Sequence, residues 1–442
     1  MSIHQNISDN INSIQNDMFD FMTELYPICR SITGNGVRKT LEMIKKHINL
    51  TIQDIPSGTS VFDWKIPKEW NISDGYIIDP KGKKIVDFKK SNLHVVGYSI
   101  PIHKKIHFDE LKNHIHTLPS QPNVIPFITS YYKETWGFCM SHNEFQKLES
   151  GEYEICIDST LENGYLTFGE FIIKGKTEKE FLISCYVCHP SLCNDNLSGV
   201  VLATFLAKQL KNLSLNYSYR FLFIPETIGA ITWLSLNEKN LHKIEAGLVA
   251  TCLADSGTST YKKSRIGNAK IDEIVPYVLE HSKTDFSIVD FYPYGSDERQ
   301  FCSPGFNLPI GSLMRTPYRK FEEYHTSADD LMFIKKDSLG DSFNKYLETI
   351  MIFDHDAKYL NTNQKCEPQL GKRGLYRNLG FRRTDETSND TEQQELAMFW
   401  ILNLSDGNNS LFDIAKTSQI PFSTIDQVAN LLNEKNLLTK II

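Results

Sequence analysis

The stretch YVCHPSLCNDNLSG, from Tyr186 to Gly199, is where the chain changes from strand to helix. The run FLISCYVC, which ends at Cys188, is mainly apolar, and the run SGVVLATFLAKQL, which starts at Ser198, has apolar residues at helical spacing. This change of period predicts a buried strand, a short loop and a helix. The loop contains His189 and Asp195, and an imidazole and a carboxylate are ligands that catalytic zinc takes. In open α/β sheets, functional sites form where strands end and helices begin.

The same alternation of strand and helix patterns continues to about residue 356. YRFLFIPE, AGLVATCLAD and FNLPIGSLMR read as strands, and a helical pattern follows each of them. Alternation of this kind predicts an α/β fold with a mainly parallel sheet sandwiched by helices. Between residues 51 and 175 the segments are short, β-branched or aromatic, and separated by turn residues, which predicts a β-rich region. From Thr391 onward, three helical patterns and a short strand indicate a winged helix-turn-helix.

Acidic and imidazole residues recur where the predicted strands end. Glu226 ends YRFLFIPE, Asp255 ends AGLVATCLAD, and His325 follows the last strand in EYHTSADD. Taken singly, each has a plain structural explanation, such as capping the next helix or lying on the surface. Because parallel strands end at one edge of a sheet, we expect all three to converge with His189 and Asp195. Two imidazoles and carboxylates with room for water would form an open catalytic zinc site.

Composition limits the classes of function. The chain has 442 residues, 40% of them hydrophobic and 23% charged, with a net charge of −7, which is typical of a globular protein of two or three domains. The net negative charge argues against a nucleic-acid partner. MSIHQNISDNINSIQND at the N-terminus has no apolar stretch of a signal peptide, and no run reaches the roughly 18 apolar residues of a membrane helix. Nine scattered cysteines favour reduced thiols, so a cytoplasmic protein without membrane partners is predicted.

Two competing interpretations fit less well. The segment CYVCH, residues 185–189, has the spacing of haem attachment. Its two cysteines are three positions apart in a strand and face opposite sides, so they cannot both reach one haem. A DNA-binding regulator would use the C-terminal helices, but residues 391–442 carry three basic and six acidic side chains, a net charge of 3 − 6 = −3. That charge suits a phosphate backbone poorly.

The order of these motifs resembles the zinc aminopeptidases of the bacterial leucyl aminopeptidase group, over about residues 180–360. That group has a first His ligand, an Asp-Asn pair whose Asp bridges two zinc ions, a Glu-Glu pair, a later Asp, and a His in a His-Thr-x-x-Asp context. The resemblance implies one or two zinc ions. Their ligands would be His189, Asp195, Asp255 and His325.

The Glu-Glu pair departs from the pattern of that group, because Glu226 is followed by Thr227. The Ile-Gly that comes next favours matching Glu226 to the first glutamate, the general base, which leaves one carboxylate ligand missing. The other alignment makes Glu226 a ligand and leaves the base missing. Asp297 and Arg299 in YGSDERQF, together with Tyr324, are candidates to bind substrate.

The whole chain more closely resembles a bacterial aminopeptidase-like family that often accompanies polysaccharide-biosynthesis genes. The resemblance is carried by CRSITGNGVRKTL, WKIPKEW, YYKETWGFCMS, CHPSLCNDNLSG, IPETIG and SDERQFCSPG. It implies a zinc aminopeptidase-like domain formed by residues 1–60 and 165–365. It also implies an inserted β-rich domain at 61–164 and a winged helix domain at 376–442.

These observations lead us to expect a zinc-dependent hydrolase. We expect an aminopeptidase that acts on short peptides or aminoacyl amides with metal-activated water, and Glu226 as its catalytic base. A zinc amidase or deacetylase without peptidase activity, or a scaffold in polysaccharide biosynthesis, is the first alternative. A DNA-binding regulator is the second alternative, and the sequence leaves open whether the protein forms a homo-oligomer.

Overall fold

The computed structural model describes residues 10–375 and 389–441, so residues 1–9 and 376–388, which include the predicted start of the winged helix domain, lie outside the described residues. The chain divides into two compact units, Met1–Pro276 with Thr284–Tyr346 and Tyr277–Lys283 with Leu347–Ile442. None of the helices in the described ranges is both long and apolar enough to cross a membrane.

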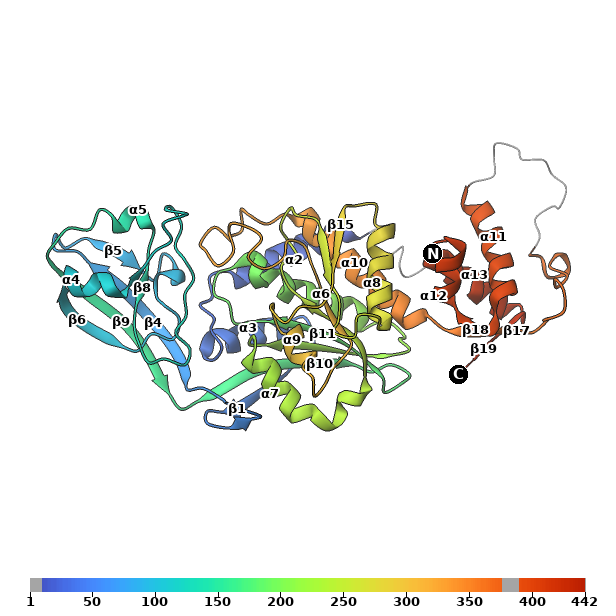
Figure 1. Ribbon diagram of the computed structural model, residues 1–442, viewed down its shortest axis with the longest axis horizontal. Helices are drawn as coiled ribbons and strands as arrows, with labels where there is room; N and C mark the ends of the chain where they lie inside the picture. Colours follow the sequence, from blue (N-terminus) through green and yellow to red (C-terminus); the bar gives the residue numbers. More distant parts are fainter. Residues whose placement is uncertain (1–9, 376–388, 442) are drawn as a thin grey trace. The chain divides into compact units, whose positions relative to one another are not determined.

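An eight-stranded sheet forms the centre of the first unit (Figure 1). Its four inner strands run parallel to their neighbours, and antiparallel partners flank them on both sides. This arrangement confirms the α/β fold with a mainly parallel centre. In spatial order the strands are β1 (Thr51–Pro56), β10 (Tyr165–Ile173), β12 (Ser218–Ile224), β11 (Glu180–Tyr186), β13 (Ile244–Ala250), β16 (Ile310–Met314), β14 (Ser259–Lys262) and β15 (Phe286–Val289).

Helices cover both faces of this sheet, which explains why β11 and β12 are buried along their whole length and lack the alternation of a half-exposed strand. In Figure 1, α2 and α6 lie above the sheet and α7 lies below it. Trp233 of α7 belongs to the same buried cluster as Leu182 and Leu222 of the sheet. The helices are α2 (Ile11–Leu25), α3 (Asn35–Lys45), α6 (Ser198–Leu210), α7 (Ile228–Asn237), α8 (Lys270–His281), α9 (Glu298–Phe301) and α10 (Lys336–His355).

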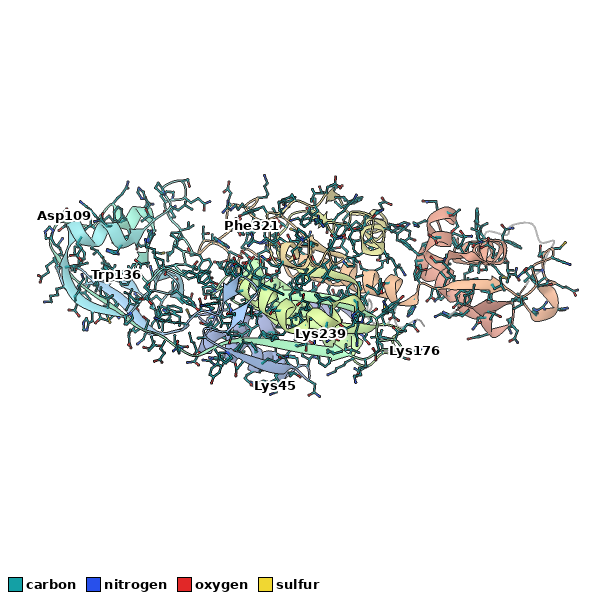
Figure 2. All side chains as sticks on the ribbon, turned by 60° about the horizontal axis from the view of Figure 1, so that its bottom comes forward. Lys45, Asp109, Trp136, Lys176, Lys239 and Phe321 are labelled. Atoms are coloured by element: carbon teal, nitrogen blue, oxygen red, sulfur yellow. The ribbon has the colours of Figure 1, made fainter. Side chains whose placement is uncertain are left out.

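The chain between β1 and β10 leaves the central sheet and builds a second, antiparallel sheet around its own core. Figure 2 shows Asp109 and Trp136 in this inserted region. Within this region the segment FDELKNHIHTL begins with the short helix Phe108–Leu111, and Ile115 and His116 then enter a strand pair. The elements are β2 (Ser60–Val61), β3 (Trp64–Lys65), β4 (Glu69–Ile78), β5 (Lys84–Asp87), β6 (Ile102–His107), α4 (Phe108–Leu111), β7 (Ile115–His116), β8 (Phe138–Cys139), α5 (His142–Phe145) and β9 (Glu152–Glu162).

The second unit contains the winged helix. Its helices are α11 (Asn389–Leu404), α12 (Leu411–Ser418) and α13 (Phe422–Glu434), and its sheet is formed by β17 (Lys358–Asn361), β18 (Asp406–Ser410) and β19 (Leu438–Lys440). The strand β17 lies between β18 and β19 and pairs with both. This strand ends at Asn361 and so lies before residue 376, the predicted start of the winged helix domain. The pattern of its own residues does not indicate which sheet it joins, because its partner strands come from much later in the chain.

Candidate metal centre

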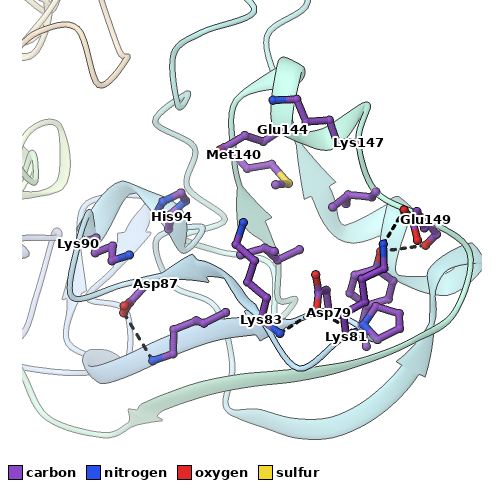
Figure 3. Close-up of a pocket in the computed structure, with 15 residues that line it drawn as sticks. Asp79, Lys81, Lys83, Asp87, Lys90, His94, Met140, Glu144, Lys147 and Glu149 are labelled. Atoms are coloured by element: carbon purple, nitrogen blue, oxygen red, sulfur yellow. Dashed lines mark hydrogen bonds and ion pairs between the residues drawn. The ribbon is translucent and has the colours of Figure 1, made fainter.

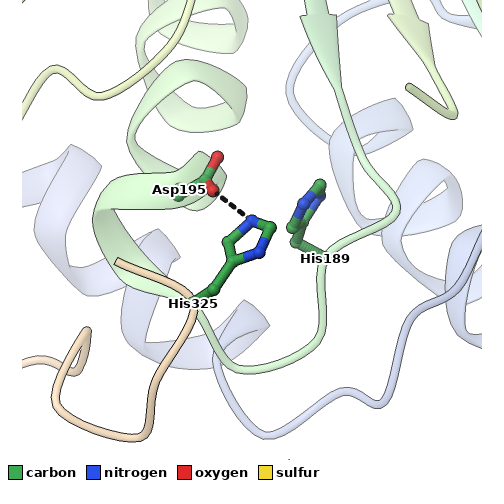
Figure 4. Close-up of side chains that lie close together, drawn as sticks. All are labelled: His189, Asp195 and His325. Carbon is green, nitrogen blue, oxygen red and sulfur yellow. Dashed lines mark ion pairs between the residues drawn. The ribbon is translucent and has the colours of Figure 1, made fainter. Parts of the chain in front are cut away.

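Three predicted residues, His189, Asp195 and His325, come together beyond the ends of the central strands (Figure 4). Each offers one ligand atom, and these atoms all lie within 4.8 Å of one another. His325 Nε2 lies 3.0 Å from Asp195 Oδ2, and the centroids of the two imidazole rings are 5.3 Å apart. The structure thus brings together donors from two distant parts of the sequence, and their role as metal ligands stays a prediction.

His189 lies three residues after the end of β11 and is almost completely buried. The guanidinium of Arg30 holds this segment, because its Nε donates to the carbonyl oxygen of His189 at 2.8 Å. Burial lowers the pKa of His189 to about 4, although the nearby Asp195 opposes the shift. The imidazole is therefore neutral at neutral pH, which is the protonation state that binds metals.

Asp195 is held in an ionised state by its neighbours. Burial opposes the charge, but His189, His325 and the hydroxyl of Tyr186 together lower the pKa of Asp195 to about 2. The Tyr186 hydroxyl donates to Asp195 Oδ1, and it also lies 2.6 Å from Thr251 Oγ1. The second carboxylate oxygen is left to face His325.

A further carboxylate, Asp329, connects the loop of Asp195 to the loop of His325. It is fully buried, and it accepts the backbone N–H groups of Asn194 and Asp195 at 2.6 and 2.9 Å. Asp329 lies four residues after His325 in the same loop. This loop therefore carries His325 and, through Asp329, also holds the backbone of Asp195. The sequence placed Asp329 in the His-Thr-x-x-Asp motif but gave no sign of this role, which depends on a contact with a distant loop.

The inserted region also positions the site, through contacts with the loop of His325. The backbone N–H of Phe127 donates to the carbonyl oxygen of His325 at 2.8 Å, and the Phe127 ring meets the imidazole edge-on at a centroid distance of 5.2 Å. Tyr324 stacks on the same imidazole at 4.0 Å. His325 adopts a left-handed backbone conformation, with φ of 55°, which is uncommon for any residue other than glycine. These contacts define the orientation of its ring.

Glu226 stands beside this group, two residues after β12 ends. Its Oε2 atom lies 3.8 Å from Nε2 of His189. Burial, together with the negative charge of Asp195, raises the pKa of Glu226 to about 7. A carboxylate with such a pKa can both take up and release a proton near neutral pH.

Asp255, the predicted fourth ligand, lies outside the group of three. Its carboxylate accepts hydrogen bonds from Asn194 Nδ2, from the N–H of Gly257, and from both the hydroxyl and the N–H of Thr316. The residue that directly follows β13 is Thr251, and three residues lie between it and Asp255. Asp255 therefore braces the loop of Asn194 instead of joining the other three donors.

The predicted substrate-binding residues lie at different depths. Asp297 is fully buried and accepts the N–H of Thr227 at 2.7 Å, so it has no exposed atom to offer a substrate. Arg299 donates from Nη2 to the Thr227 hydroxyl at 3.1 Å. Both hold the residue after Glu226 in place. Tyr324 is only partly buried and lies against the imidazole of His325, next to the site.

A cavity of about 440 Å³ lies in the inserted region, and none of the three grouped residues lines it (Figure 3). Its walls carry both lysines and acids, several of them already paired, such as Lys81 with Glu149 and Lys84 with Asp87. A second cavity, of about 210 Å³, has Glu226 in its wall. The smaller cavity is therefore the one next to the candidate chemistry.

Two family models match this chain, one over its larger part and one at its C-terminal end. A family model described as a domain of unknown function (DUF4910) matches residues 19–356, and a winged helix-turn-helix model matches residues 357–440. The chain belongs to the first family. The second match agrees with the structure, because it begins just before β17.

Relatives share the sequence closely, and more distant proteins share the fold. A Clostridium acetobutylicum protein named "Putative polysaccharide biosynthesis protein with aminopeptidase-like domain" is 54% identical over 422 residues, which are 96% of each chain. A crystal structure of a "putative peptidase" from the same organism is 52% identical, with a TM-score of 0.92 over 99% of each chain. A zinc aminopeptidase from Bacillus subtilis is 13% identical, with a TM-score of 0.56 over 77% of this chain and 94% of its own. The last likeness shows an aminopeptidase-like fold.

Proposed function

We propose that this protein is a metal-dependent hydrolase of amide bonds, an aminopeptidase that acts on short peptides or aminoacyl amides. The observation that carries the proposal is the meeting of His189, Asp195 and His325 beside Glu226. The aminopeptidase-like fold supports it, because open α/β sheets bind ligands beyond the ends of their strands, and these residues lie in loops that follow strands.

The three grouped residues fit a zinc ion. Two imidazole nitrogens and one carboxylate oxygen are the donor set of open catalytic zinc sites. Among the residues that the structure describes, Asp195 Oδ2 and His325 Nε2 are buried atoms that lie 3.0 Å from each other and have no hydrogen-bond partner elsewhere. Their lone pairs are therefore available to a cation. A zinc ion held there would lower the pKa of bound water toward ~7 and polarise the carbonyl of a substrate.

Glu226 would supply the proton transfers. Its carboxylate takes a proton from the water whose oxygen attacks the amide carbon, and it returns that proton to the nitrogen as the C–N bond breaks. The pKa of about 7 suits both transfers near neutral pH. Tyr186 and Asp329 contribute by fixing Asp195, one through its side chain and the other through its backbone.

Metal content and amide hydrolysis test the proposal together. Protein as purified should contain zinc, and it should hydrolyse aminoacyl amides or short peptides. Glu226→Gln should lower kcat by about 10²- to 10⁴-fold while metal content stays unchanged, because only the proton carrier is lost. Glu238→Gln, at an exposed site, is the matched control and should keep wild-type activity. A correctly folded protein that binds no metal, or hydrolysis that survives Glu226→Gln, would defeat the proposal.

A second candidate rests on the name of the Clostridium acetobutylicum relative, which mentions polysaccharide biosynthesis. The same group of residues would then cleave the amide of an acylated amino sugar. Parallel assays on aminoacyl amides and on N-acylated amino sugars distinguish the two candidates, because the preferred substrate shows the higher kcat/KM.

A further inference from the structure

The cavity beside Glu226 is built from both the central sheet and the inserted region. Its volume of about 210 Å³ is smaller than the roughly 300 Å³ at which pockets for whole drug-sized ligands begin, so it has the size for one substituent of a substrate. Five separate segments of the chain line it. The lining residues are Ile32, Trp64, Tyr131, Tyr132, Cys188, Glu226, Thr227 and Ile228.

The inner aromatic wall of this cavity is rigid. The ring of Tyr131 meets that of Tyr98 edge-on at 5.4 Å, and Tyr98 stacks on Trp70 at 5.8 Å. The Tyr98 hydroxyl lies 2.6 Å from Thr33 Oγ1, and Trp70 Nε1 donates to the carbonyl oxygen of Ser99 at 2.8 Å. Because each ring is held by a hydrogen bond or a neighbouring ring, this wall can receive a ligand without rearranging.

The outer wall is aromatic and open to solvent. Trp64, in the hairpin of β2 and β3, remains 39% exposed, and Tyr132 remains 57% exposed. Their rings meet edge-on at a centroid distance of 5.6 Å. Two large aromatic side chains exposed together at the opening of a cavity have apolar surface that a bound group can remove from water.

The side chains that line the cavity disfavour a negatively charged substituent of a substrate. Six of the eight lining residues are aliphatic, aromatic or cysteine, none is Lys, Arg or His, and Glu226 is the one carboxylate among them. An acidic substituent would lie against this carboxylate with no basic side chain in the cavity wall itself, which is unfavourable in a site of low polarity.

We propose that Trp64 and Tyr132 determine the substrate specificity of this protein. Together with Tyr131 they form a pocket for an uncharged aromatic ring of the substrate, next to the amide bond at which Glu226 transfers protons. The assignment rests on the proposed hydrolase function for its reaction, and on the cavity alone for its ligand. The favoured substrates carry phenylalanine- or tyrosine-like side chains, and those with glutamate-like side chains are rejected.

Binding of uncleavable amino alcohols to the full-length, metal-containing protein tests the assignment without any turnover. L-Phenylalaninol, L-alaninol and the amino alcohol of glutamate share one head group, so differences in Kd report on the side chain. L-Phenylalaninol should bind at least about tenfold tighter than L-alaninol, with the acidic compound weakest. Trp64→Ala and Tyr132→Ala should each remove most of that preference, while Trp64→Phe keeps it. Tyr165→Ala, which removes an exposed ring that does not line the cavity, is the matched control.

Equal affinities for the phenyl and methyl side chains, tight binding of the acidic compound, or no binding at all would overturn the assignment. Tighter binding of N-acetylglucosamine than of L-phenylalaninol would also overturn it, since that result would show that the pocket binds a sugar ring. Failure of the hydrolase proposal is distinguishable: the ring preference would remain in binding while hydrolysis is absent. Thermal unfolding identifies any variant that fails to fold. If Trp64→Ala or Tyr132→Ala does not fold, the preference for the phenyl side chain is measured in the other of the two variants.

Discussion

Replacing Asp329 by alanine tests whether one buried carboxylate holds the loop of the candidate metal centre. Its oxygens accept the N–H groups of Asn194 and Asp195 at 2.6 and 2.9 Å. Alanine leaves both groups buried without a partner, and each such group costs about 1–3 kcal/mol. The free energy of unfolding should therefore fall by about 2–6 kcal/mol. The affinity for zinc should also fall, by about 10- to 100-fold, because Asp195 is no longer positioned.

Two measurements on the full-length protein check this prediction. Urea unfolding gives the change in the free energy of unfolding, and zinc titration against a competing chelator gives the change in metal affinity. Asp285→Ala, which removes an exposed carboxylate of the same kind, is the control and should change stability by less than about 0.5 kcal/mol. Wild-type stability together with wild-type zinc affinity in Asp329→Ala would refute the positioning argument.

Three further predictions concern stability, and each is measured by unfolding of the full-length protein. Ser410→Ala should lower the free energy of unfolding of the winged helix by about 1 kcal/mol, since the Ser410 hydroxyl accepts the N–H of Asp413 in a capping box at the start of α12; no change would contradict the cap. Burial opposes charge on His355, but Asp426, at 2.8 Å, raises the pKa of His355 above its ordinary value. The folded state therefore favours the protonated form, so the stability that Asp426 contributes is complete below about pH 6.5 and is lost as the pH rises through the raised pKa. Comparison of Asp426→Asn with the wild type at several pH values checks this, and a difference that does not depend on pH would count against it. Trp233→Ala should cost about 3–5 kcal/mol, because Trp233 is 1% exposed in the main core and its removal leaves a large cavity; a loss below about 1 kcal/mol would show that the core can collapse around the site.

The sequence by itself determined the elements and their order in the central fold. FLISCYVC is apolar at every position except Ser184 because β11 is covered on both faces, and the pattern after Ser198 has a helical period because α6 follows. Such patterns depend only on neighbours along the chain. One further rule, that parallel strands end at the same edge of a sheet, predicted that the residues at the strand ends converge. His189, Asp195 and His325 were among those residues.

Only the tertiary structure decided which strand-end residues meet. Asp255 follows the same strand as Thr251, but the path of the loop beyond β13 turns its carboxylate toward Asn194 and Thr316. The strand β17 joins a sheet whose other strands come from much later in the chain, and Phe127 from the insertion holds the loop of His325. Contacts of this kind depend on where loops travel in space. Short-range sequence patterns carry no information about that, because the partners are separated by tens to hundreds of residues.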